Sequence, residues 1–102
     1  MFIGIDLGTS SIKMILVDQN QRIIATATSS LTVQSPKDGF SEQNPQEWID
    51  STMECFETLK LKKPKEFSQT LSLGISGHMH GATLIDKDGN IIRPCILWND
   101  TR

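Results

Sequence analysis

The sequence predicts an α/β fold whose mixed sheet begins as a three-stranded antiparallel meander. Three apolar segments with strand-like alternation lie within residues 2–31, and the turns between them are too short for a parallel crossover. A segment with helical spacing starts near residue 45, and another strand-like segment starts at residue 70. The expected order of elements is therefore strand, strand, strand, helix, strand.

The meander is predicted from the first 31 residues. In residues 2–7, Ile and Leu occupy every second position, and Asp6 lies on the opposite face. A turn of small residues at 8–11 leads to residues 12–17, which are largely apolar on both faces, as expected for a strand covered on both sides. A polar turn at 18–21 and a third strand at 22–31 follow.

A helix is predicted after the polar loop at residues 32–44. Asn44 is a suitable N-cap, Pro45 suits the first helical position, and Glu47 lies three residues after the cap. Five apolar side chains at helical spacing predict the stripe that faces the sheet: Trp48, Ile49, Met53, Phe56 and Leu59. We expect the lysine-rich segment 60–65, interrupted by Pro64, to end the helix and to remain solvated.

A fourth strand is predicted at residues 70–76, with Leu71, Leu73 and Ile75 pointing inward. It leads into a loop bounded by glycines. Apolar segments at 82–85 and 91–97 then flank an Asp-Gly turn, which predicts a small hairpin.

Composition and charge exclude several classes of protein. The net charge is −2 with interspersed signs, so there is no basic footprint for nucleic acid or an anionic membrane. No apolar run approaches the ~20 residues that span a bilayer, and the N-terminus lacks a secretory pattern. We expect a soluble, cytoplasmic protein in which Cys55 and Cys95 are buried, reduced apolar side chains.

The first candidate site is the turn after the first strand. Asp6 is a carboxylate at a strand end, and Gly8, Thr9 and Ser10 can hold phosphate oxygens with backbone N–H groups and hydroxyls. A carboxylate beside them can hold Mg²⁺ through water, and Lys13 can add positive charge. An ordinary hairpin turn is the alternative, because the glycine spacings of the common nucleotide-binding motifs are absent.

Two further candidate sites lie later in the chain. The glycine-bounded loop carries His78 and His80, with no third metal ligand nearby. Two interpretations are open: the loop brings His80 to a small molecule, or both histidines simply face solvent. Trp98, followed by Asn99 and Asp100, combines an apolar wall with polar groups and suits a polyhydroxylated ligand. The alternative there is a core tryptophan followed by a surface turn.

Four motifs, taken in order, resemble the N-terminal part of the FGGY carbohydrate kinases. They are Asp6-Leu7-Gly8-Thr9, Phe40-Ser41-Glu42-Gln43-Asn44-Pro45 before the Trp-bearing helix, Gly74 to Gly81, and Ile96 to Asp100. The first motif is shared with other actin-like ATPases and is weakly specific. Met79-His80-Gly81 together with Trp98-Asn99-Asp100 is much more specific and most resembles the bacterial members that phosphorylate xylulose.

This resemblance implies a ribonuclease-H-like fold of the actin-like ATPase type. It also implies transfer of the γ-phosphoryl group of ATP, with Mg²⁺, to the 5-hydroxyl of D-xylulose. Asp6 would support the metal and phosphates, with Gly8, Thr9, Ser10 and Lys13 on the ATP side and Met79, His80, Trp98, Asn99 and Asp100 on the sugar side. The implied partners are the sugar and ATP, with no nucleic acid or membrane. Whether the complete enzyme forms a homodimer is left open.

The length of the chain limits this expectation. Family members are several times longer than these 102 residues, and their general-base aspartate lies beyond this segment. We therefore expect residues 1–102 to form an incomplete N-terminal part of domain I, without domain II, and to be inactive and self-associating in isolation. Two alternatives stay open. One is a related kinase for gluconate, ribulose or glycerol, and the other is a non-enzymatic actin-like interaction module.

Overall fold

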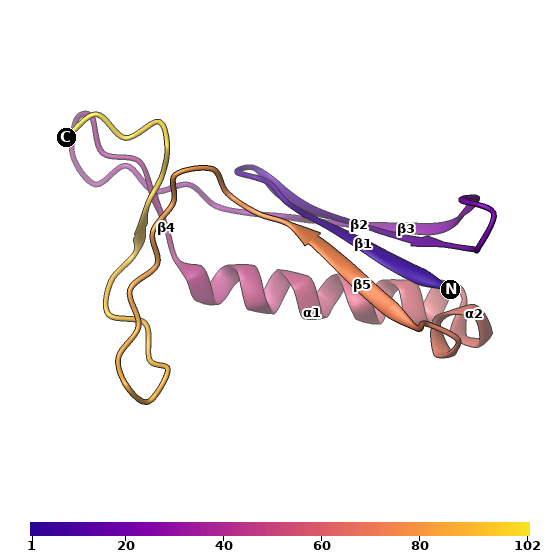
Figure 1. The fold of residues 1–102 in the computed structure, drawn as a ribbon. Helices are drawn as coiled ribbons and strands as arrows, with labels where there is room; N and C mark the ends of the chain where they lie inside the picture. Colours follow the sequence, from indigo (N-terminus) through magenta and orange to yellow (C-terminus); the bar gives the residue numbers. More distant parts are fainter.

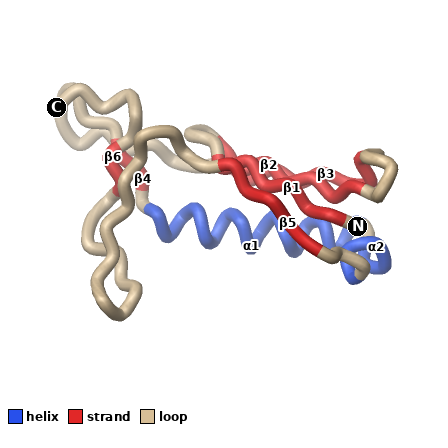
Figure 2. The backbone as a smooth tube through the Cα atoms, viewed as in Figure 1, coloured by secondary structure: helices blue, strands red, loops and turns tan.

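The fold consists of a four-stranded mixed sheet, a long helix on one of its faces, and an irregular arm at one end (Figures 1 and 2). The computed structural model describes all residues 1–102. The strands of the main sheet are β1 (Phe2–Leu7), β2 (Ser11–Val17), β3 (Ile23–Ser30) and β5 (Ser72–Ser76). The helices are α1 (Pro45–Lys62) and α2 (Pro64–Ser68), and a second sheet pairs β4 (Glu42–Gln43) with β6 (Cys95–Ile96).

The main sheet has the strand order β3-β2-β1-β5. β1 is antiparallel to β2 and β2 is antiparallel to β3, so the predicted meander is confirmed. Helix α1 carries the chain back along the sheet, and β5 therefore pairs with β1 in parallel, with Asp6 beside Ser76. This register brings the carboxyl ends of β1 and β5 to the same end of the sheet.

Helix α1 begins as the sequence predicts. The side chain of Asn44 accepts a hydrogen bond from the backbone N–H of Gln46 at 3.0 Å, and Pro45 occupies the first turn. Glu47 does not bond back to the cap, because its carboxylate accepts the backbone N–H of Thr32 at 2.8 Å. The start of the helix is thereby tied to the end of the meander.

The helix face that packs on the sheet differs from the predicted stripe. Ser51, Cys55 and Leu59, spaced four residues apart, are buried, while Trp48 and Phe56 are half-buried. Ile49 and Met53 are 59% and 55% exposed, so their predicted place in the core is wrong. The reason is the position of α1 over β3 and β2, which turns the small residues Ser51 and Cys55 toward the strands.

The core lies between α1 and one face of the sheet. It contains Ile3, Ile5, Ile12, Met14, Leu16, Ala27, Leu31, Cys55 and Leu59. The opposite face of the sheet has no layer over it, and Lys13 is exposed there while Ile15 and Val17 are half-buried (Figure 1). The prediction that β2 is covered on both sides is therefore wrong for this chain.

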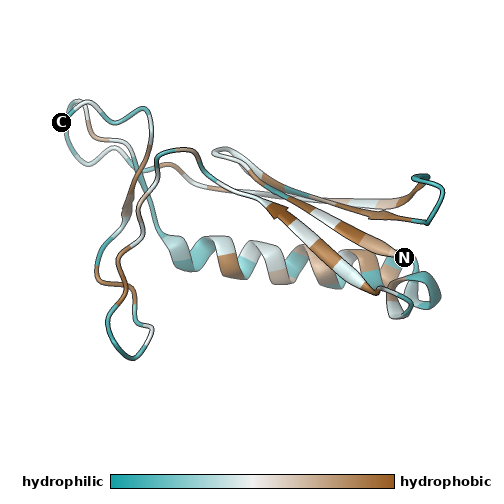
Figure 3. Ribbon diagram, viewed as in Figure 1, coloured by the Kyte–Doolittle hydropathy of each residue, from teal (hydrophilic) through white to brown (hydrophobic).

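Strand β5 lies at the edge of the sheet with its apolar side chains uncovered. Leu71, Leu73 and Ile75 are 80%, 51% and 65% exposed, which contradicts their predicted inward orientation. Helix α1 lies over the opposite edge, β3 and β2, so nothing on the helix side covers β5. Figure 3 shows the resulting alternation of apolar and polar residues along this open strand.

The arm at the end of the sheet contains residues 77–102 and the segment before α1. The predicted hairpin forms only as isolated bridges, with Ile85 opposite Ile91, around a turn in which the Asp86 carboxylate accepts the backbone N–H of Asn90 at 2.9 Å. β6 pairs with β4, a strand inside the segment predicted as a loop. The radius of gyration is 15.5 Å, against about 13 Å for a compact chain of this length, because the arm extends away from the sheet.

Both cysteines are buried and free, as predicted, and neither helix is long and apolar enough to cross a membrane.

Candidate functional site

The main pocket lies where the end of β1, the loop after β5 and the segment after β6 meet. It is a hollow of about 400 Å³ lined by Asp6, Leu7, Gly8, Thr9, Gly77, His78, Met79, His80 and Trp98. Asp6 and Trp98, more than 90 positions apart in sequence, therefore line the same pocket. The structure thus brings residues of all three candidate sites into one pocket.

One wall of the pocket is the end of β1 and the turn after it, residues 6–9. The Asp6 carboxylate is exposed at the strand end and accepts a hydrogen bond from the Ser76 hydroxyl at 3.1 Å. The backbone N–H of Gly8 donates to the Ser11 carbonyl at 3.0 Å. A Cβ at Gly8 would lie 2.9 Å from that carbonyl oxygen, so the turn requires glycine for close backbone approach.

The opposite wall is the loop 77–81. His80 has φ +59°, a left-handed conformation that is costly for a residue with a side chain and that clusters at functional sites. The His78 ring packs against Trp48 with centroids 5.0 Å apart, and its buried Nε2 has no hydrogen-bond partner. Burial lowers the pKa of His78, so its imidazole is neutral at pH 7.

Trp98 closes the pocket on the third side. Its side chain is 62% exposed, and its indole N–H donates to the Thr9 hydroxyl at 3.3 Å. An exposed indole held by a hydrogen bond at its edge presents an apolar face to the pocket. The alternative interpretation of Trp98 as a core residue is therefore wrong.

Gln43 supports the pocket from behind and was not singled out as a functional residue by the sequence. It is fully buried, its side-chain N–H donates to the Thr9 carbonyl at 2.6 Å, and its oxygen accepts the Trp48 indole N–H at 2.8 Å. Gln43 lies in the Phe40 to Pro45 motif that carries the family resemblance, but a polar residue in a predicted loop gives no sign of burial. Its place behind the pocket follows only from the pairing of β4 with β6 and from its two hydrogen bonds.

Four of the predicted site residues do not line the main pocket. Ser10 and Asn99 are exposed beside it. Lys13 lies opposite Asp6 in the register of β1 and β2, and both line a smaller hollow of about 230 Å³. Asp100 is engaged elsewhere, in a network of charged side chains.

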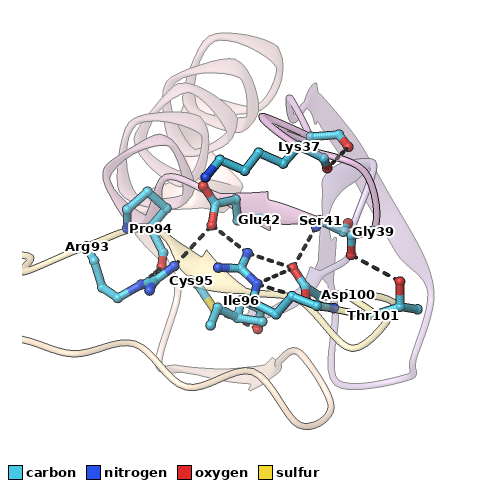
Figure 4. A network of polar contacts seen from close by, with 12 residues as sticks. Lys37, Gly39, Ser41, Glu42, Arg93, Pro94, Cys95, Ile96, Asp100 and Thr101 are labelled. Atoms are coloured by element: carbon cyan, nitrogen blue, oxygen red, sulfur yellow. Dashed lines mark hydrogen bonds and ion pairs between the residues drawn. The ribbon is translucent and has the colours of Figure 1, made fainter.

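This network, shown in Figure 4, joins the segment after β6 to the segment before α1. Asp100 accepts the Ser41 N–H at 2.7 Å and pairs with Arg102 at 2.6 Å, while Glu42 pairs with Arg102 at 2.8 Å and with Arg93 at 3.0 Å. The Arg102 guanidinium beside Asp100 holds the pKa of that carboxyl well below its usual range. The network fixes the segment that carries Trp98 against β4.

The pocket offers a single carboxylate, Asp6, and no group of three or more His, Cys, Asp or Glu side chains converges anywhere in the chain. An all-protein metal cage is therefore absent. An exposed carboxylate beside a turn with free space fits Mg²⁺, which commonly uses one or two carboxylates together with waters and phosphate oxygens.

Comparison with known proteins identifies the family. The family model for the FGGY family of carbohydrate kinases, N-terminal domain, matches residues 1–102. The chain is 43% identical over 102 residues to a xylulose kinase of Escherichia coli, covering all of this chain and 21% of that protein. The chain thus spans about a fifth of the length of the curated relatives that it matches.

Solved structures agree with the sequence comparison. A Brucella ovis structure described as a xyloylose kinase superposes with a TM-score of 0.95 at 48% identity, covering 98% of this chain and 21% of that one. A xylulose kinase from Rhodospirillum rubrum superposes with a TM-score of 0.93 at 30% identity, covering 98% of this chain and 20% of that one. The predicted actin-like ATPase fold is confirmed, and the chain belongs to the FGGY family of carbohydrate kinases.

Proposed function

We propose that residues 1–102 are the N-terminal part of domain I of an ATP-dependent sugar kinase. The complete enzyme transfers the γ-phosphoryl group of ATP to the 5-hydroxyl of D-xylulose and releases D-xylulose 5-phosphate and ADP. One observation carries the proposal: a single pocket has a carboxylate and a glycine turn on one wall and Met79, His80 and Trp98 on the others. The xylulose kinase names of several relatives support this choice of sugar.

The turn after β1 is the phosphate side of this proposal. Gly8 forms the tight turn through its bond to Ser11, and Thr9 and Ser10 supply backbone N–H groups and hydroxyls for phosphate oxygens. Lys13 adds positive charge near Asp6. Asp6 holds Mg²⁺ through water. The bound Mg²⁺ neutralises charge on the phosphates, so this part of the chain contributes positioning and electrostatic stabilisation.

The loop 77–81 and the segment after β6 are the sugar side. The Trp98 indole supplies an apolar face, and Met79 and His80 contribute a flexible apolar contact and an imidazole that can donate or accept a hydrogen bond. Asn99 and Asp100 follow directly. The Asp100 carboxylate already accepts hydrogen bonds from Ser41 and Arg102. Its role in this proposal is therefore to hold the segment that carries Trp98, rather than to bind the sugar.

The proton of the attacking hydroxyl has no acceptor assigned in this chain. The general base belongs to the remainder of the kinase, together with the second wall of the ATP cleft. Purified residues 1–102 alone are therefore inactive, and turnover by this material would contradict the proposal.

The test is a phosphorylation assay of the complete kinase that contains this segment. D-xylulose, ribulose, gluconate and glycerol are each supplied with MgATP, and ADP release and the phosphorylated product are measured. We expect kcat/KM to be highest for D-xylulose, with phosphate on the 5-hydroxyl. A higher value for another sugar would overturn the choice of substrate, and no phosphorylation of any of them would favour the interaction module.

A further inference from the structure

The Gln43 side chain is a buried amide with both of its ends paired. It is completely excluded from solvent, its Nε2 donates to the Thr9 carbonyl at 2.6 Å, and its Oε1 accepts the Trp48 indole N–H at 2.8 Å. A buried amide that lost one partner would leave an unsatisfied polar atom, which costs about 1–3 kcal/mol. The orientation of this amide is therefore determined by both partners at once.

The two partners of Gln43 connect it to opposite walls of the pocket. Thr9 is in the phosphate-side turn itself. Trp48 contacts His78 in the sugar-side loop through their rings, whose centroids are 5.0 Å apart. Gln43 thus bonds to one wall directly and supports the other through a single intervening side chain.

Gln43 itself is firmly anchored. Its strand β4 pairs with β6, where Gln43 lies opposite Cys95, and its neighbour Glu42 is held by Arg93 and Arg102. Gly81, the last residue of the sugar-side loop, packs against the same Cys95, since a Cβ there would lie 3.3 Å from its sulfur. The amide can therefore act as a rigid spacer between the two walls.

We propose that Gln43 is a positioning residue that sets the separation of the phosphate-side turn and the sugar-side loop. The inference rests on the proposed kinase function and concerns how that site is assembled. Phosphoryl transfer depends mainly on alignment of donor and acceptor, and a displacement of about 1 Å can lower the rate about 100-fold. A side chain that spaces the two walls therefore controls kcat without touching either substrate.

The variants Gln43→Met and Gln43→Glu, made in the complete kinase, test this proposal. Methionine keeps the length and removes both hydrogen bonds. Glutamate can accept from Trp48 but places a carboxylate oxygen against the Thr9 carbonyl, unless the carboxyl is protonated and donates instead. We expect kcat per folded enzyme to fall about 10- to 100-fold in both, with smaller changes in the Michaelis constants.

The pH profile separates positioning from a purely structural role. As the pH falls, Gln43→Glu recovers kcat because the protonated carboxyl restores the bond to Thr9, whereas Gln43→Met does not. Gln46→Met is the matched control, since Gln46 is exposed on α1 and its side chain bonds only to Asp50. Trp48→Phe, which keeps a ring beside His78 and removes the indole donor, is the second variant if those at Gln43 do not fold.

An unchanged kcat per folded enzyme in Gln43→Met would overturn the proposal, as would an equal loss in Gln46→Met. A measurement independent of activity uses the amide and indole resonances in NMR spectra of the same proteins. We expect Gln43→Met to shift the resonances of Ser10, Trp48 and the loop 77–81 together. A shift confined to one wall would overturn the spacing role, even if the enzyme phosphorylated none of the sugars and the proposed function itself failed.

Discussion

Asp6 is an acidic side chain in the main pocket whose local contacts are few. It is exposed at the end of β1 and accepts one side-chain hydrogen bond, from the Ser76 hydroxyl at 3.1 Å. An exposed carboxylate with one such bond contributes little to stability. Its position beside the glycine turn agrees with the role in phosphate chemistry proposed above.

We predict that Asp6→Ala in the complete kinase lowers kcat by on the order of 100-fold or more, because charge stabilisation near the phosphates is lost. Sugar affinity, from calorimetry, and the melting temperature stay close to those of the unmodified enzyme. Asp88→Asn, at the exposed tip of the arm, is the control and leaves kcat unchanged. An unaltered kcat in Asp6→Ala would contradict the assigned role.

His78 makes the stability of the protein depend on pH. Burial lowers its pKa below the ordinary value of 6.5, so the unfolded chain binds a proton more readily than the folded chain. Well above pH 6.5 both states are neutral and His78 has no effect. As the pH falls below 6.5, the free energy of unfolding decreases until the folded pKa is reached.

Urea unfolding of residues 1–102 between pH 7.5 and 5 measures this effect. We predict that the loss of stability toward acid is smaller in His78→Gln than in the unmodified chain. Met79→Gln, at an exposed position of the same loop that carries no titratable group, should keep the full loss. Identical pH dependence in the unmodified chain and His78→Gln would refute the prediction.

At the scale of elements, helix α1 stabilises the meander through its buried face. Leu59 is fully buried, while Met53 of the predicted stripe is 55% exposed. We predict that Leu59→Ala lowers the free energy of unfolding of residues 1–102 by about 2–5 kcal/mol, because it leaves a cavity in the core. We expect Met53→Ala to have less than half that effect. Equal losses of stability would instead indicate that Met53 packs against the sheet, as the predicted stripe requires.

The arm is held by charged contacts as well as by the buried side chains of Cys95 and Leu97. Glu42, Asp100 and Arg102 form ion pairs, and the Arg102 guanidinium lies 3.7 Å from the centroid of the Phe40 ring. They hold the segment after β6 against the segment before α1. Placement of Trp98 over the pocket therefore depends on side chains outside the pocket.

At the scale of the molecule, two features leave apolar surface open. β5 is an uncovered edge strand, and Leu73 and Ile75 lie on the helix side of the sheet where α1 does not reach. Exposed edge strands and apolar patches promote pairing between molecules. The chain is therefore suited to burial against further structure.

We predict that purified residues 1–102 self-associate, measured as the molar mass by light scattering after size-exclusion chromatography. The double variant Leu73→Lys/Ile75→Lys shifts the population toward the monomer, because charges on the edge strand oppose pairing. Leu61→Lys, at a position 82% exposed near the end of α1, is the control and leaves the distribution unchanged. A monomeric unmodified chain would argue against the open edge as an association surface.

Much of the fold follows from local chemistry. The turns at 8–11 and 18–21, the cap at Asn44, the alternation in 2–7 and the presence of a strand at 12–17 depend on residues close in sequence, and all appear as predicted. The errors share a different cause. Burial of Ile49, Met53, Leu73 and Ile75 depends on which elements lie over them, and periodicity alone does not contain that information.

The candidate site divides in the same way. Its residue types were recognisable from sequence, because a strand-end carboxylate, a glycine turn and a Trp-Asn-Asp run each have a chemical meaning at short range. Their convergence in one pocket was decided by the parallel pairing of β5 with β1 and by the β4–β6 pairing. The part played by Gln43 arose only there, since its two hydrogen-bond partners are 34 and 5 residues away and meet only in the folded chain.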